Sequence, residues 1–437
     1  MLTLLAYSMV LVFMVLIMTD RLSALLALIL VPVAFALLAG FGGEIGKMVL
    51  DGIRNLAPTG VLLLFAILYF GIMIDAGLFD PVARTVLRFV GGDPVKIVMG
   101  TVVLASIVSL DGDSSTSYLI TTTAMLPLYR RLGMRPLTAA CVIMLAAGNM
   151  NLTPWGGPTA RAASALHVDA NALFVPLIPT MVACFGFALF VAWVLGRQER
   201  ARIGVANLPG LDEVPAPTGG VVDTVEPLPP ERRPHLLWVN FGLTVVLMAG
   251  LLLGILPLPL LFMIGFAVAT AINYPNLAEQ KRRIAAHAPN VLAVVSLIFA
   301  AGVFTGILSG TGMVEAMARS VTAIIPDSAG RFVPLITALV SIPFTFLISN
   351  DAFYFGILPI LAEAGSNFGH GAEAIGRASL VGQQVHLLSP LVASTYLLVG
   401  LCEVDFGAHQ RFTLPWALCA AMVMLLAGGL VGAFPLF

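Results

Sequence analysis

The sequence predicts an all-α integral membrane protein made of two inverted repeats, each with about five transmembrane helices, a re-entrant hairpin and a broken helix. Three observations support this fold class. Hydrophobic residues make up 59% of the 437 residues and charged residues only 10%, whereas a soluble domain carries about 25% charged residues. One long polar stretch, rich in proline, divides the apolar sequence into two nearly equal parts. Short motifs of the first part recur in the second.

The polar stretch sets the predicted domain organisation. It runs from Arg197 to His235 and holds seven prolines and most of the local charge, which is typical of a linker outside the membrane. We therefore expect a first repeat over 1–196, a linker over 197–235 and a second repeat over 236–437.

Composition excludes two classes of function. A net charge of −1 provides no basic surface for nucleic acid. The four cysteines lie scattered in apolar segments without the spacing of a disulfide or metal site, so we expect small core residues.

The apolar run at 2–18 lacks the basic start and cleavage site of a signal peptide, and we expect it to be a retained helix.

The predicted elements follow the same order in both halves. The leading spans lie near 2–18, 22–41 and 57–79, and then near 236–256, 259–274 and 291–309. Interrupted segments follow near 95–130 and 333–361, broken spans near 137–168 and 378–401, and closing helices near 173–195 and 413–434. The arms of the interrupted segments are shorter than the ~20 residues of a spanning helix. Re-entrant hairpins fit them better than the alternative, two full spans each.

Three motif pairs favour a duplication, because they keep their order. Phe70–Leu78 resembles Thr305–Met313, Met125-Leu126-Pro127 resembles Ile357-Leu358-Pro359, and Leu152-Thr153-Pro154 resembles Leu388-Ser389-Pro390. With hairpins, each half crosses the membrane five times, and an odd number of crossings inverts the second half.

The distribution of Lys and Arg predicts the orientation. With the linker in the cytoplasm, sixteen basic residues lie inside and six outside, as the positive-inside rule requires. Both termini are then outside, and we expect a multi-pass protein of the inner membrane. The outside residues are Lys47, Arg54, Arg161, Arg319, Arg331 and Arg377.

Polar residues interrupt both predicted hairpins. The first tip contains Ser109, Asp111, Asp113, Ser114, Ser115 and Thr116, and the second contains Ser349, Asn350 and Asp351. A charge at the bilayer centre costs at least ~2.5–3.5 kcal/mol, so such residues are seldom incidental. We expect ion or proton binding at both tips. The alternatives are a water-exposed loop at the first tip and a helix cap in a surface turn at the second.

Both broken spans carry polar residues beside their prolines. The first contains Asn149, Asn151, Thr153, Gly156, Gly157, Thr159 and Arg161, and the second contains His386 and Ser389. A half-helix starting near Pro158 offers free N–H groups to an anion, and Arg161 can bind a carboxylate through two hydrogen bonds. Alternatively, Arg161 reaches the outer interface, the glycines serve helix packing, and His386 is a core residue rather than a proton relay.

Inverted repeats with interrupted helices are the architecture of secondary transporters, whose site lies where the breaks meet. Asp111, Asp113 and Asp351 cannot all stay ionised beside an anionic substrate in a low dielectric. The cargo must bring cations, or protons must bind. We expect proton coupling through Asp111, Asp113, Asp351 and His386, and metal contact through the three aspartates by way of a metal–carboxylate substrate.

The string Ser109–Thr116, the motif Leu126-Pro127-Leu128-Tyr129 and the stretch Asn151–Ala162 resemble the citrate–divalent-metal:proton symporter family of the ion transporter superfamily. The resemblance covers essentially the whole chain. Together with the polar residues at the four breaks, it gives the expected substrate-binding set Ser109, Asp111, Asp113, Ser114, Ser115, Thr116, Asn149, Asn151, Thr153, Gly156, Gly157, Thr159, Arg161, Ser349, Asn350, Asp351 and Ser389. The related sodium–dicarboxylate carriers have Ser-Asn-Thr at both tips, which this chain lacks.

The resemblance implies proton-coupled symport of citrate complexed with a divalent metal of the Mg or Ca class, by an elevator-like motion. It also implies no permanently bound cofactor, contact with membrane lipid, and a homodimer. The alternatives are another organic anion, such as gluconate or a dicarboxylate, a proton antiporter of the same superfamily, and a membrane-embedded aspartyl hydrolase. The adjacent Asp111-Gly112-Asp113 and the repeat speak against the hydrolase, and we expect a protein that is not an enzyme.

Overall fold

The computed structural model describes residues 2–19, 21–90, 92–112, 114–204, 231–323 and 327–436. Every regular element in these residues is a helix, which confirms the predicted all-α class. Six of the described helices are long and apolar enough to cross a membrane. Seven shorter apolar helices accompany them, as expected for a multi-pass protein with interrupted spans.

The first half begins with α1 (Leu2–Met18), α2 (Ala24–Leu38) and the long α3 (Ile45–Ala76). After α4 (Asp80–Val90), two antiparallel helices meet at a short turn. The helices and 3-10 turns of this half after α4 are α5 (Pro94–Val108), η1 (Ser109–Asp111), α6 (Ser114–Leu132), α7 (Pro136–Met150), α8 (Gly157–Leu166), α9 (Ala170–Phe174), η2 (Val175–Leu177) and α10 (Ile178–Ile203).

The second half has the same order of long and short helices. Its described elements are η4 (Pro234–Leu236), α11 (Leu237–Leu252), α12 (Leu258–Asn273), α13 (Leu277–Gly310), α14 (Met313–Thr322), α15 (Asp327–Gly330), α16 (Val333–Leu347), the π-helix η5 (Ala352–Ile357), α17 (Leu358–Ser366), α18 (Ala372–Ser379), η6 (Leu380–Gly382), α19 (Gln383–His386), α20 (Ala393–Cys402) and α21 (Phe406–Leu430). The inverted relation of the two halves remains a prediction.

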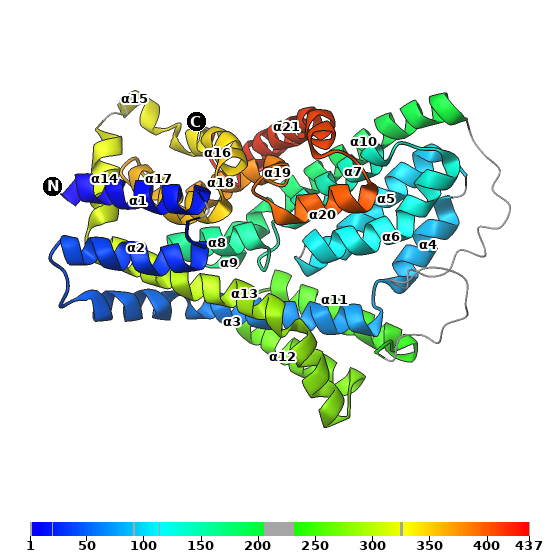
Figure 1. The fold of residues 1–437 in the computed structure, drawn as a ribbon, viewed down its shortest axis with the longest axis horizontal. Helices are drawn as coiled ribbons and strands as arrows, with labels where there is room; N and C mark the ends of the chain where they lie inside the picture. Colours follow the sequence, from blue (N-terminus) through cyan, green and yellow to red (C-terminus); the bar gives the residue numbers. More distant parts are fainter. Residues whose placement is uncertain are drawn as a thin grey trace.

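Glycines bring the two longest helices, α3 and α13, into close contact (Figure 1). A Cβ on Gly52 would overlap the carbonyl oxygen of Gly302 and lie 2.8 Å from the Cα of Gly306. Without water to drive association, membrane helices rely on such small residues to bring their backbones together. The α3–α13 pair therefore forms a tightly packed strut along the molecule.

The first helix and the end of α10 lie toward opposite ends of the long axis. Figure 1 shows α1 starting on the left, with the α2–α3 connection, whereas α10 ends far to the right. The basic residues of α4 and those near the end of α10 lie toward the same right-hand end. The orientation of these ends in the membrane remains a prediction.

Several boundaries differ from the sequence prediction. Helices α3 and α13 start 12 and 14 residues before the expected 57 and 291, because their charged first turns are still helical. The predicted linker is shorter, since α10 continues to Ile203. Its central part, 205–230, lies outside the described residues. The amphipathic helices α4 and α14 were not predicted; each places charge on one face of a short helix.

Candidate functional site

A cavity of about 370 Å³ lies where the two hairpin tips and the two broken spans meet. Figure 1 shows α8, α19 and α20 near the middle of the long axis, away from both ends. The lining residues are Gly112, Ser114, Ser115, Asn151, Gly157, Pro158, Arg161, Ser349, Asn350, Asp351, His386, Leu387, Leu391, Val392 and Ser394. All four breaks contribute, and the volume falls in the range of small-molecule sites.

The first hairpin turns sharply at Gly112, between η1 and α6. Gly112 has φ +80°, a left-handed conformation that favours glycine, and an added Cβ would lie 2.9 Å from the Trp155 ring. The indole Nε1 of Trp155 donates a hydrogen bond of 2.8 Å to the carbonyl of Leu110. Trp155 thus ties the hairpin tip to the first broken span.

Asp111 lies behind the tip rather than on the cavity wall. Its side chain is buried, and its Oδ1 accepts a hydrogen bond of 3.3 Å from the Ser117 hydroxyl. The prediction for Asp113 falls outside the described residues.

The first broken span is interrupted by a tight turn between α7 and α8. Gly156 has no room for a side chain, because a Cβ would overlap the carbonyl oxygen of Asn151. Thr159 closes the turn by donating a 2.8 Å hydrogen bond to the Leu152 carbonyl. Gly157 and Pro158, the first residues of α8, line the cavity. The N-terminal end of a ten-residue helix therefore faces the cavity, an arrangement that favours anions.

The second hairpin tip is held by polar contacts on two sides. Ser349 Oγ accepts from the Ala352 amide at 3.1 Å. The side-chain amides of Asn350 and Gln383 exchange hydrogen bonds of 3.0 and 3.4 Å. The next six residues form a π-helix, a form often found at functional sites.

An ion pair joins the second tip to the first broken span. Arg161 Nε donates to Asp351 Oδ1 at 2.6 Å, and the side chains are 22% and 15% exposed. Arg161 therefore points into the cavity toward Asp351. In the alternative interpretation it would instead reach the outer membrane interface. Among the described residues that line the cavity, Arg161 is the one arginine and Asp351 the one acid, so one positive charge balances one negative charge.

His386 and Ser389 belong to the second broken span and differ in position. His386 lines the cavity, and its Nδ1 lies 2.7 Å from the Thr345 carbonyl oxygen. Since a carbonyl only accepts, Nδ1 carries the hydrogen and Nε2 of the neutral ring is an acceptor. Ser389 is fully buried, and its hydroxyl accepts from the Leu391 amide.

Nine of the predicted site residues line the cavity: Ser114, Ser115, Asn151, Gly157, Arg161, Ser349, Asn350, Asp351 and His386. The other described residues of the predicted set do not line it. These are Ser109, Asp111, Thr116, Asn149, Thr153, Gly156, Thr159 and Ser389. In the described part of the chain no three acidic, histidine or cysteine side chains group as a metal site. A metal in this cavity would need ligands from its own complex.

Sequence reasoning missed Gln383, which bonds to Asn350 and to the Tyr354 hydroxyl at 3.0 Å. It also missed the contact between Trp155 and the first tip. Both residues lie within the predicted broken spans, near 137–168 and 378–401, so their position was a usable signal.

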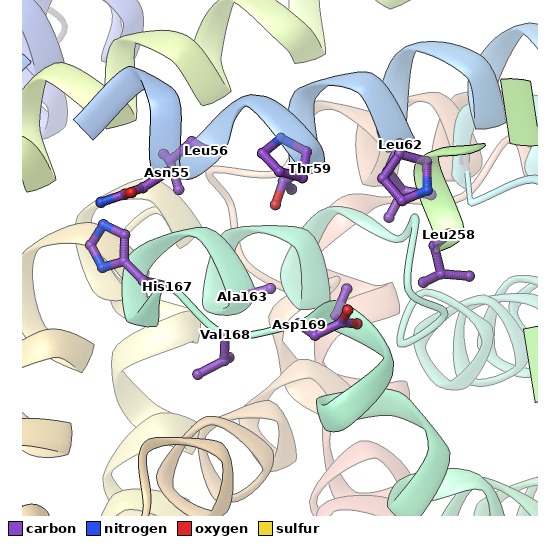
Figure 2. Close-up of a pocket in the computed structure, with 12 residues that line it drawn as sticks. Asn55, Leu56, Thr59, Leu62, Ala163, His167, Val168, Asp169 and Leu258 are labelled. Atoms are coloured by element: carbon purple, nitrogen blue, oxygen red, sulfur yellow. The ribbon is translucent and has the colours of Figure 1, made fainter. Parts of the chain in front are cut away.

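A second cavity, of about 240 Å³, separates α3 from the α8–α9 connection (Figure 2). Asn55, Thr59 and Leu62 of α3 face Ala163, His167 and Asp169, and Leu258 of α12 closes one side. None of the predicted site residues lines it, and no pair of tips meets there. The cavity with all four breaks is the better candidate for a cargo site.

The interrupted spans and the central polar cavity define a multi-pass membrane transporter. Residues 9–382 match the family described as "Citrate transporter" (CitMHS), and the chain belongs to this family. It is 57% identical to a "Citrate transporter" of Bacillus subtilis and 52% identical to that organism's "Mg(2+)/citrate complex secondary transporter", each over 99% of both chains. Membership in a transporter family overturns the hydrolase alternative: the protein is not an enzyme.

Two solved structures share the fold. The YdaH transporter of Alcanivorax borkumensis has a TM-score of 0.57 at 16% identity, over 90% of this chain and 89% of its own. MtrF of Neisseria gonorrhoeae has a TM-score of 0.57 at 14% identity, over 90% of this chain and 85% of its own.

Proposed function

We propose that this protein is a proton-coupled symporter that carries citrate complexed with a divalent metal ion of the Mg or Ca class. The observation that carries the proposal is the Arg161–Asp351 pair in a cavity lined by hydroxyls, two side-chain amides and a helix N-terminus. Citrate carboxylates suit Arg161 and the first turn of α8. A hard cation suits oxygen ligands such as the Asp351 carboxylate. The names of the two Bacillus subtilis relatives support the same cargo.

Proton binding is assigned to groups at or just behind the cavity. His386 lines the polar cavity, and because its Nδ1 donates to the Thr345 carbonyl, Nε2 is the ring nitrogen that would accept a proton. Asp111 and Asp351 are the other candidates among the described residues, and Asp113 is the third acid of the tips. A proton on any of these groups lowers the cost of bringing an anionic complex beside the acids.

The proposed motion is elevator-like. The hairpins and broken spans would move as one body along the α3–α13 strut, whose two helices are held together by their glycine contacts. The cavity of Figure 2 lies at this boundary, between α3 and α8–α9. We propose a homodimer in the inner membrane, in contact with lipid.

Uptake of labelled citrate into proteoliposomes tests the function. With an alkaline interior and Mg²⁺, Ca²⁺ or Zn²⁺ outside, we expect accumulation that stops when EDTA is added or a protonophore removes the pH gradient. Accumulation that persists in EDTA would contradict the metal-complex cargo. Competition by gluconate or a dicarboxylate without any metal would favour another organic anion.

Cysteine labelling tests the proposed orientation. Cys419 is the exposed cysteine of the described chain, so Cys419→Ser provides a quiet background. Ala201→Cys, exposed near the end of α10, should resist an impermeant thiol reagent added to intact cells. Gly43→Cys, exposed between α2 and α3, should react. The opposite pattern would place the linker outside and the termini inside.

A further inference from the structure

We infer that the Arg161–Asp351 ion pair determines the selectivity of the site. When cargo binds, the contact between the two side chains opens, and each side chain forms a new contact with the cargo. Asp351 turns to the metal of the complex and Arg161 to a carboxylate of the citrate. The inference rests on the proposed function and adds the reason why the complex is taken rather than its parts.

The pair is placed where it can be exchanged. Both side chains line the cavity and keep partial exposure, 22% for Arg161 and 15% for Asp351. Asp351 is the acidic partner of Arg161 in the described chain, through a single contact from Nε to Oδ1. Gly157 leaves room for the guanidinium, since a Cβ there would lie 2.8 Å from Nη1. A cargo entering the cavity meets both charges together.

Charge complementarity then separates three ligands. Free citrate satisfies Arg161 but leaves the Asp351 carboxylate unpaired beside its own negative charge. A free divalent cation satisfies Asp351 but leaves Arg161 unpaired beside a dication. An unpaired charge in a partly buried site is strongly unfavourable. The metal–citrate complex presents a cation and a carboxylate together, and only this ligand compensates both members of the opened pair.

The surrounding contacts keep the second tip in place when the pair opens. Asn350 remains bonded to Gln383, and Ser349 remains the cap of Ala352. On the other side, Thr159 holds the start of α8 through the Leu152 carbonyl. The exchange therefore requires movement of two side chains and no unfolding of either break.

Ligand binding to the purified full-length protein in detergent tests the inference. Isothermal titration of Mg–citrate, of citrate in EDTA and of Mg²⁺ alone is compared for wild type, Asp351→Asn, Arg161→Gln and the double variant. Wild type should prefer Mg–citrate to free citrate by at least about tenfold in Kd. Asp351→Asn should lose that preference and bind free citrate more tightly than wild type does. Arg161→Gln should bind Mg²⁺ alone more tightly and Mg–citrate more weakly.

The double variant removes both charges, so no unpaired charge is left in the site to destabilise the fold. It should bind citrate weakly, with no preference for the Mg–citrate complex. Arg54→Gln, which removes the exposed Arg54–Asp51 pair on α3, is the matched control and should behave as wild type. If both single variants bind Mg–citrate and free citrate more weakly by the same factor, and so keep the wild-type preference for Mg–citrate, the inference is overturned. Wild type that binds neither citrate form would contradict the proposed function instead.

Discussion

Replacing Arg161 with glutamate is expected to lower Mg–citrate uptake by at least about 100-fold, because it sets two carboxylates against each other beside an anionic cargo. Like charges about 4 Å apart repel by ~4 kcal/mol at an effective dielectric constant of 20. Asp351 would lose its 2.6 Å partner, and the citrate carboxylates would lose their cation. Initial rates of labelled citrate uptake into proteoliposomes measure the loss.

Arg54→Glu is the control for this charge reversal. Arg54 pairs with Asp51 three residues earlier at 3.3 Å, but the side chains are 75% and 50% exposed. Exposed pairs contribute only ~0–1 kcal/mol, so uptake by this variant should stay close to wild type. An Arg161→Glu variant that is folded and transports normally would show that the central cavity does not hold the anion.

Replacing Gly156 with alanine is expected to reduce uptake by about tenfold or more, because overpacking against backbone costs roughly 1–3 kcal/mol and displaces its surroundings. The backbone of Gly156 (φ −66°, ψ 143°) suits any residue, so the effect comes from space alone. An added Cβ overlaps the carbonyl oxygen of Asn151, and the turn that presents Gly157 and Pro158 to the cavity must shift. Uptake per folded protein, after size-exclusion chromatography, is the measurement.

Gly148→Ala is the matched control in the same broken span. Its Cβ would make ordinary contacts at 3.6 Å to Leu387 Cδ1 and 3.7 Å to the Gln383 carbonyl. Alanine also favours the helix that contains position 148. If Gly148→Ala and Gly156→Ala transport equally well, the turn at Gly156 does not shape the site.

The order of spans and the positions of the breaks were predictable from the sequence. Acidic side chains are costly in lipid, and clustered proline and glycine interrupt a helix, so Ser109–Thr116, Asn151–Thr159 and Ser349–Asp351 indicated interruptions. The early starts of α3 and α13 were missed because Lys47, Asp51 and Lys281–Arg283 were interpreted as loop charges. These charges lie on the first turns of helices longer than the membrane requires.

The roles of single polar residues were less predictable. Thr159 and Ser389 have the chemistry of ligand contacts, yet both hydrogen-bond to nearby backbone and stabilise a turn. The Arg161–Asp351 pair joins residues 190 positions apart in the chain. One sequence contains no signal for such a contact, because it depends on how the two halves pack.

Protection of single cysteines by cargo tests most directly that metal–citrate binds where the four breaks meet. In the Cys419→Ser background, Ser394→Cys reports on the central cavity and Thr59→Cys on the cavity of Figure 2. Mg–citrate should slow alkylation at position 394 by about tenfold, whereas citrate in EDTA should not, and position 59 should stay reactive. Protection at position 59 with unchanged alkylation at position 394 would contradict the account.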